Sequence, residues 1–285
     1  MNKVYACIDG AGNTSAVIDW AAWSALRLDV PLEFLHVLER DSDRTAVSDY
    51  SGAIGLGAQE SLLQELSELD EKRGKLATES GRRLLAAARE RAEIAGVARH
   101  DARLRHGELV DSVLDVETDA RLFVLGEHRH AETHGRVHLD HRVERVIRSV
   151  KRPVLVVTSE YFVAPTRFVI AFDGSATARK TVETVARSPM LAGLPVLLAM
   201  AGSDTSEARR QLEDARLVLA AAGFYVETEL AAGEPEDVLP VLVAAHAPAL
   251  LVMGAYGHSR IRQLIVGSTT TTLLRTSMAP ALILR

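Results

Sequence analysis

Short apolar runs alternate along this chain with longer segments in which apolar residues recur every three or four positions. Leu250-Leu-Val-Met253 is typical of a buried parallel strand, because both faces of such a strand are covered. The segment Ser206–Ala222 has the spacing of an amphipathic helix. Regular alternation of the two patterns predicts a parallel sheet with helices on both faces and right-handed crossovers between the strands.

The predicted order β-α-β-α-β-α-β-α-β occurs twice. The predicted strands are residues 4–8, 32–37, 98–104, 122–125 and 154–157 in the first pass, and 168–172, 195–200, 224–230, 250–253 and 281–284 in the second. Asp9-Gly10 matches Asp173-Gly174, and Gly107-Glu108 matches Gly233-Glu234, which indicates an internal duplication. We therefore predict two α/β domains, residues 1–158 and 166–285, joined by the segment Thr158–Pro165.

The first domain carries a polar insert at about residues 39–74. Asp41–Gly57 is rich in Ser, Asp and Gly and is predicted to form a loop. Two separate helical segments are expected after it, Gln59–Leu69 and Leu76–Ala95. The first of these has a stripe of leucines that either packs against this chain or contacts a partner. The stripe consists of Leu62, Leu63, Leu66 and Leu69.

Composition excludes several classes of protein. The 285 residues are 47% hydrophobic and 25% charged, with a net charge of −5 and no dense basic segment, which argues against nucleic-acid binding. Cys7 is the only cysteine, so an intrachain disulfide is excluded, and its apolar surroundings predict an inert core thiol. Because the sequence has no apolar run of about 18 residues and no signal-peptide pattern, we expect a cytoplasmic protein without a membrane segment.

A set of small residues follows the strand at 250–253. Gly254 and Gly257 come directly after it, and Gly267-Ser268-Thr269 opens a helical run. Glycine lets a ligand approach the backbone, and the N–H groups of a helix N-terminus attract phosphate oxygens. The spacing indicates a phosphate-binding loop, or simply a turn followed by a helix cap. It is not a Walker motif, because the required lysine is missing.

These residues fit the pattern Gly-x2-Gly-x9-Gly-Ser/Thr without a gap, and in this respect the chain resembles a tandem universal stress protein. Asp173-Gly-Ser175 after a first strand, Gly233-x-Pro235 before a third helix and Pro280 before a last strand support the resemblance. It implies two doubly wound, five-stranded parallel-sheet domains of Rossmann-like fold that act in stress response. It also implies ATP binding, with or without Mg²⁺, by the second domain.

The resemblance assigns a nucleotide role to eight residues. Ala171 and Asp173 would meet the adenine or ribose end, and Met200 would line the adenine pocket. The phosphates would be held by Gly254, Gly257, Gly267, Ser268 and Thr269. Alternative roles remain, because Asp173 can form an Asx turn or helix cap and Met200 can be a core residue. His258 and Arg260 either contact phosphate or are solvated.

The first domain departs from this pattern. Gly126 is followed by Glu127-His128-Arg129, so the second glycine is missing, and Asp140 lies near the place of Gly-Ser. A carboxylate repels phosphate. We predict that the first domain does not bind ATP in the manner of the family.

The same region is rich in histidine. It contains His128, His130, His134, His138 and His141. Imidazole binds zinc or nickel, but the spacing matches no metal-binding template. A solvated polar loop and a pH-sensing loop are the alternatives, and we assign no metal ligand.

The sequence lacks the residues expected of a typical catalytic site. We find no nucleophile–base arrangement, no paired carboxylates and no clear Mg²⁺-binding acid. The favoured function is an ATP-binding regulatory or protective module in stress response. The alternatives are a slow ATP hydrolase or nucleotidyl-transferring enzyme, and a small-ligand or metal-binding protein that uses the histidine-rich loop.

The resemblance also implies an assembly. Strand 154–157 would pair with strand 281–284 inside the chain, giving a pseudo-two-fold monomer whose exposed strand edges are covered. A homodimer and an unidentified protein partner remain open.

Overall fold

The strands of the two halves form one continuous sheet. The computed structural model describes residues 2–39, 56–127, 130–131, 137–138, 141–254 and 268–285. The elements of the first half are β1 (Lys3–Cys7), α1 (Thr14–Leu28), β2 (Leu32–Leu38), α2 (Leu56–Ile94), β3 (His100–His106), α3 (Leu109–Val116), the 3-10 turn η1 (Glu117–Asp119), β4 (Ala120–Gly126), β5 (His130–Ala131), β6 (Val137–His138), α4 (His141–Ser149) and β7 (Val154–Val157). Those of the second half are β8 (Arg167–Ala171), α5 (Ala176–Ala186), β9 (Val196–Ala201), α6 (Ser206–Ala221), β10 (Val226–Ala231), α7 (Pro235–Ala245), β11 (Ala249–Gly254), α8 (Ser268–Thr276) and β12 (Ala281–Leu284).

The strand order is symmetric about the middle of the sheet. It runs β10-β9-β8-β11-β12-β7-β4-β1-β2-β3, so equivalent strands of the halves lie at equal distances from the centre. Within each half, every strand pair of this ten-stranded sheet is parallel, which confirms the predicted α/β fold with doubly wound sheets. The central pair β12–β7 is antiparallel, with Ala281 opposite Val156 and Ile283 opposite Val154. This central pairing confirms the one predicted between strands 154–157 and 281–284.

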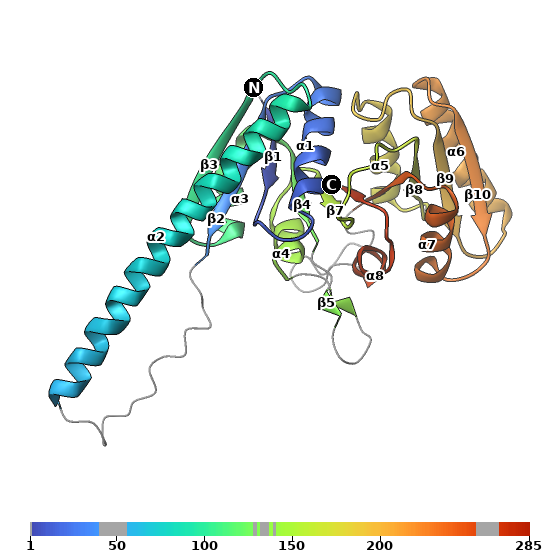
Figure 1. Ribbon diagram of the computed structural model, residues 1–285. Helices are drawn as coiled ribbons and strands as arrows, with labels where there is room; N and C mark the ends of the chain where they lie inside the picture. Colours follow the sequence, from blue (N-terminus) through green and yellow to red (C-terminus); the bar gives the residue numbers. More distant parts are fainter. Residues whose placement is uncertain (1, 40–55, 128–129, 132–136, 139–140, 255–267) are drawn as a thin grey trace.

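Helices cover both faces of the sheet, as the apolar strands require. Phe168, Val169 and Ile170 of β8 are 0% exposed although their side chains point alternately to the two faces. One apolar layer lies beneath α1, α2, α5 and α6, and the other beneath α3, α4, α7 and α8. Figure 1 shows α5 and α1 lying near the middle of the molecule.

The prediction of two helical segments at 59–69 and 76–95 is wrong, because α2 is one helix of 39 residues that passes through Gly74. A helical glycine costs only about 1 kcal/mol relative to alanine, and the flanking helix formers outweigh that cost. Lys75 and Glu71 also form an i,i+4 ion pair of 2.6 Å across the glycine. Residues 40–55, which include most of the predicted loop, lie outside the described residues.

The first part of α2 extends away from the sheet (Figure 1). Leu66 and Leu69 are 37% and 49% exposed, and the nearby Leu76 is 67% exposed. The leucine stripe therefore does not pack against the described part of this chain at these positions. The side chains of Leu62 and Leu63 lie outside the described residues.

Hydrogen bonds from arginine side chains join the two halves on both faces of the sheet. On the face with α1, the Arg27 guanidinium Nε donates to the carbonyl of Met190 at 2.8 Å. On the face with α4, the Arg285 guanidinium donates to the carbonyls of Ile147 and Arg148 at 2.6 and 2.7 Å. Those carbonyls belong to the last turn of α4, where a cation complements the helix dipole.

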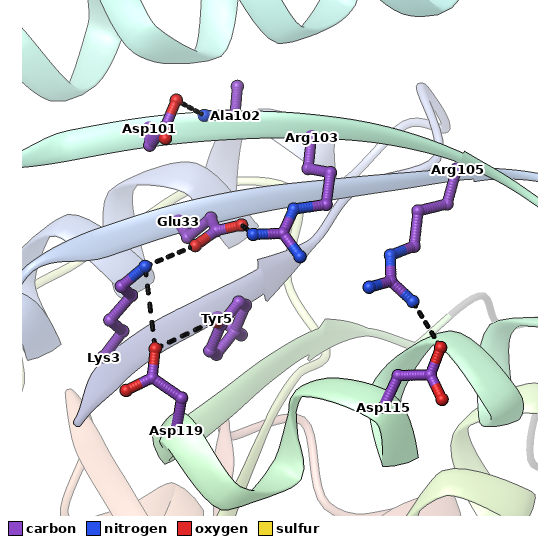
Figure 2. Close-up of polar contacts among 9 residues, drawn as sticks. All are labelled: Lys3, Tyr5, Glu33, Asp101, Ala102, Arg103, Arg105, Asp115 and Asp119. Atoms are coloured by element: carbon purple, nitrogen blue, oxygen red, sulfur yellow. Dashed lines mark hydrogen bonds and ion pairs between the residues drawn. The ribbon is translucent and has the colours of Figure 1, made fainter. Parts of the chain in front are cut away.

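A buried ionic cluster lies near the amino-terminal ends of β1 and β2 (Figure 2). The carboxylate of Glu33 is 1% exposed and accepts from the Lys3 ammonium at 2.8 Å, and Arg103 contacts its other oxygen at 2.8 Å. The Tyr5 hydroxyl donates to Asp119 at 3.3 Å. The hydrogen bond to Glu33 raises the pKa of Lys3, whereas burial and then the nearby carboxylates raise the pKa of Tyr5. Lys3 and Arg103 thus compensate the negative charge of Glu33, which would otherwise be costly to bury.

Replacing Lys3 by Met should therefore destabilise the protein by about 1–3 kcal/mol, because Glu33 loses a charged hydrogen-bond donor while it stays buried. The matched control is Lys75→Met, which breaks an ion pair whose side chains are 75% and 66% exposed, and should cost at most about 0.5 kcal/mol. Urea denaturation at pH 7 measures both free energies of unfolding. Equal losses in the two variants would contradict the structural role of the cluster.

Cys7 should be unreactive in the native protein. Burial, together with the carboxylate of Asp9, raises the pKa of its thiol to about 12, and only the thiolate is nucleophilic. We expect iodoacetamide at pH 8 to leave the folded protein unmodified and to alkylate it fully in guanidinium. Mass spectrometry distinguishes the two states, and rapid alkylation of the folded chain would refute the assignment.

Candidate functional site

The carboxyl ends of β8, β9 and β11 meet at one edge of the second half. The first three strands of this half lie side by side in the order β8, β9, β10, toward the edge of the sheet. The next two strands, β11 and β12, lie on the other side of β8. The crevice between β8 and β11 is thus a topological switch point, the place where open α/β sheets bind ligands. Ala171 pairs with Ala199, one residue before Met200, and Ile170 pairs with Val252, two residues before Gly254. The structure therefore brings the predicted residues Ala171, Asp173, Met200 and Gly254 to the same edge.

The loop after β8 is a tight turn built by Asp173. Its Oδ1 accepts from the Ser175 N–H at 2.9 Å, and Gly174 between them has φ +72°. The Ser175 hydroxyl oxygen then accepts from the Ala178 N–H at 3.1 Å and caps α5. The Asx turn proposed as the alternative role of Asp173 is present. Asp173 is exposed, and its second carboxylate oxygen makes no hydrogen bond to a described residue, so a ligand hydroxyl could donate to it.

Gly254 has a packing role that the sequence pattern did not reveal. A Cβ added there would lie 2.8 Å from both Thr177 Cγ2 and Thr181 Oγ1 of α5. At the equivalent Gly126 of the first half, a Cβ would lie 2.6 Å from Asn13 Oδ1. In both halves, therefore, a strand end packs so closely against the start of the first helix or the residue before it that a side chain does not fit, whether or not a nucleotide binds.

Met200 and Ala171 differ in how they contribute to this edge. The Met200 side chain is 6% exposed and belongs to the apolar layer beneath α5 and α6, as its alternative role as a core residue requires. Ala171 is half-buried at the end of β8. Contact of either residue with adenine stays a prediction.

The remaining predicted phosphate ligands lie in and just after a segment outside the described residues. Gly257, Gly267, His258 and Arg260 fall within 255–267, of which the structure describes nothing. Helix α8 begins at Ser268, one residue before the predicted helical run, with Thr269 as its second residue. The short strand β6 of the first half lies beside α8, so the histidine-rich segment of one half borders the predicted site of the other.

The equivalent edge of the first half holds a cleft of only about 40 Å³. Glu39 and Arg142 line it and form an ion pair of 2.9 Å. The Leu109 N–H at the start of α3 donates to Glu39 Oε1 at 3.2 Å. A carboxylate of the protein thus occupies a helix N-terminus that would otherwise be available to an anionic ligand.

Sequence reasoning missed both Glu39 and Arg142. The available signal was their position, since Glu39 directly follows β2 and Arg142 lies in the first turn of α4. Both positions are at the carboxyl edge of a parallel sheet.

The histidine-rich segment is not simply a loop, because it contains a two-stranded antiparallel pair in which His130 is opposite His138. His141 opens α4, and His128 and His134 lie outside the described residues. Among the residues that the structure describes, no three His, Cys, Asp or Glu side chains are grouped so that they could hold a metal ion. In the same residues, no helix combines the length and apolar character that a membrane span needs.

Comparison with known proteins gives concordant results in sequence and structure. The model of the universal stress protein family matches residues 1–158 and 165–285. Universal stress protein Slr1230 of Synechocystis sp. is 34% identical over 288 aligned positions that span all of both chains. A universal stress protein from Archaeoglobus fulgidus has a TM-score of 0.71 at 19% identity, over 100% of this chain and 98% of that one. A putative universal stress protein from Pseudomonas aeruginosa has a TM-score of 0.65 at 16% identity, over 100% and 93% of the two chains. The duplicated fold, the match of both halves to the family model and the full-length relative together show that this chain belongs to the universal stress protein family.

Proposed function

We propose that the second domain, residues 166–285, binds ATP and that the protein acts in stress response as a nucleotide-dependent regulatory or protective module. The observation that carries the proposal is the convergence at one switch point of the Asp173 turn and Gly254, the last residue of β11. Bound ATP would stabilise the folded second domain by mass action, which gives the nucleotide a means to regulate the protein.

The nucleotide would lie across the crevice between β8 and β11. The free oxygen of Asp173 would accept from a ribose hydroxyl, while the adenine would approach Ala171 and Met200. The phosphates would lie against Gly254, Gly257 and Gly267. The N-terminus of α8 would supply unpaired N–H groups and a partial positive charge, with Ser268 and Thr269 as further donors. Mg²⁺ would accompany the phosphates as a ligand of the nucleotide itself.

The first domain would not bind a second nucleotide. The Glu39–Arg142 ion pair lines its cleft, and the Glu39 carboxylate is bonded at the start of α3. A triphosphate there would have to displace an ion pair and then face the released carboxylate. We therefore propose one nucleotide per chain.

Replacing Gly257 or Gly267 by Leu should abolish ATP binding, because a side chain would fill the space of the phosphates and hold them away from the backbone donors. Isothermal titration of nucleotide-free protein should show one ATP per wild-type chain and no measurable binding to either variant. Gly74→Leu is the matched control, since a Cβ at Gly74 meets nothing within 4 Å. Full retention of ATP by both phosphate-loop variants would refute the proposal.

Replacing the two equivalent aspartates, Asp9 and Asp173, by alanine should affect ATP binding differently. Asp9 Oδ1 accepts from the Ala11 N–H at 3.0 Å, as Asp173 Oδ1 does from Ser175, so both build the same turn. Asp173→Ala should weaken ATP binding about 10- to 100-fold through loss of a charged hydrogen bond to ribose. Asp9→Ala should leave the affinity for ATP unchanged, although it should perturb the fold to the same extent as Asp173→Ala. Equal affinities of the two variants for ATP would contradict the placement of the nucleotide.

A further inference from the structure

A cavity of about 360 Å³ lies between the two halves, on the face of the sheet that carries α1 and α5. Most of its apolar lining comes from β4, from β12 and from the segment that follows α5. The apolar lining residues are Leu122, Leu282, Leu284, Met190 and Leu191, together with Leu28, Pro153 and Val185. Small-molecule sites in proteins occupy roughly 300–1,000 Å³ and are mostly apolar with a few polar groups, and this cavity fits that description.

The charged groups around the cavity are mainly cationic. Arg121, Arg152, Lys180 and Arg187 line it together with one carboxylate, Glu183. The Arg152 guanidinium donates to the carbonyls of Glu117 and Thr118 at 3.2 and 3.3 Å. Arg121, Lys180 and Arg187 are exposed, and no ion pair joins them to a carboxylate within the described part of the chain. The cavity therefore offers cationic donors next to apolar walls.

The internal duplication shows that this opening is not a necessary feature of the fold. Since Asp173 corresponds to Asp9, the positions of Lys180, Thr184 and Arg187 on α5 correspond to those of Ala16, Trp20 and Trp23 on α1. Ala16 and Trp20 are 1% and 2% exposed. Trp20 packs edge-on against Phe162 with ring centroids 5.1 Å apart, and against Trp23 at 5.3 Å. Aromatic rings thus cover this face of α1, whereas the equivalent face of α5 is open and carries cationic side chains.

The cavity is also separate from the proposed nucleotide site. Thr184 and Arg187 lie in the last turn of α5 or just after it, and Lys180 lies near the middle of the helix, whereas Asp173 precedes its first turn. A helix of 11 residues is about 16 Å long, so Thr184 and Arg187 lie at the opposite end of α5 from Asp173.

We infer that this cavity binds an amphipathic anion, in which a carboxylate or phosphate head contacts the cationic side chains and an apolar body lies against Leu122, Leu282 and Met190. A neutral molecule would leave the cations without a partner, and an amphipathic cation would be repelled by them. An inorganic anion would leave the apolar walls exposed to water. The combination of charge and apolar surface therefore selects the ligand class.

Titration calorimetry with decanoate, decyl phosphate, decanol and decyltrimethylammonium tests the inference below the micelle concentration of each compound. We expect at least one of the two anions to bind once per chain, about tenfold or more tighter than decanol, and the ammonium compound not to bind. The anion that binds more tightly identifies the head group. Failure of both anions to saturate, or equal binding of anion and ammonium, would overturn the inference.

Two variants locate the binding site. Thr184→Trp introduces the residue that α1 carries at the equivalent position, and it should abolish decanoate binding without lowering Tm. Lys180→Gln combined with Arg187→Gln should weaken decanoate binding about tenfold and leave decanol unchanged. The matched control is Arg82→Gln with Arg89→Gln, which removes two exposed charges from α2 and should change neither. Decanoate affinity that is unchanged in the Lys180/Arg187 double variant would overturn the inference, even if Thr184→Trp fails to fold.

Discussion

The antiparallel pairing of β7 with β12 is the constraint on which the rest of the structure depends. Each half ends on a strand whose outer edge would expose unpaired N–H and C=O groups, and such an edge invites aggregation. Pairing of Leu155 with Leu282 and of their neighbours closes both edges at once. It also brings α1 near α5 on one face, and places Arg285 of one half on the carbonyls that end α4 of the other. The seam contacts and the cavity between the halves follow from this single pairing.

Much of the fold could be predicted from local pattern and repetition. Apolar runs such as 250–253 must be buried on both faces, so they identified parallel strands, and the duplication fixed equivalent elements in the two halves. The continuous α2 could not be predicted in this way, because Gly74 is a local signal for an interruption that the flanking residues outweigh. The β5–β6 pair was missed because two-residue strands have no readable period.

The candidate site was only partly predictable, for a different reason. The sequence placed Asp173 and Gly254 at one edge of the sheet, as the structure does, since chain order determines which strand ends are neighbours. It could not reveal that Gly254 is required by contact with Thr177 and Thr181, or that Glu39 meets Arg142. Both facts depend on distances between elements that are remote in sequence. A glycine pattern can therefore combine a packing requirement with a ligand requirement, and only coordinates separate the two.

The short connection between β7 and β8, residues 158–166, has a thermodynamic consequence. Two separate subunits that met through their last strands would dissociate on dilution, whereas a tether of this length holds the partners at an effective concentration in the millimolar range. A pair made of two copies must also accept every substitution twice. In this chain the seam forms in a single molecule at any protein concentration, so each half has been free to acquire its own residues. Glu39 and Arg142 on one side, and Lys180 and Arg187 on the other, are substitutions that a symmetric pair would have had to carry in duplicate.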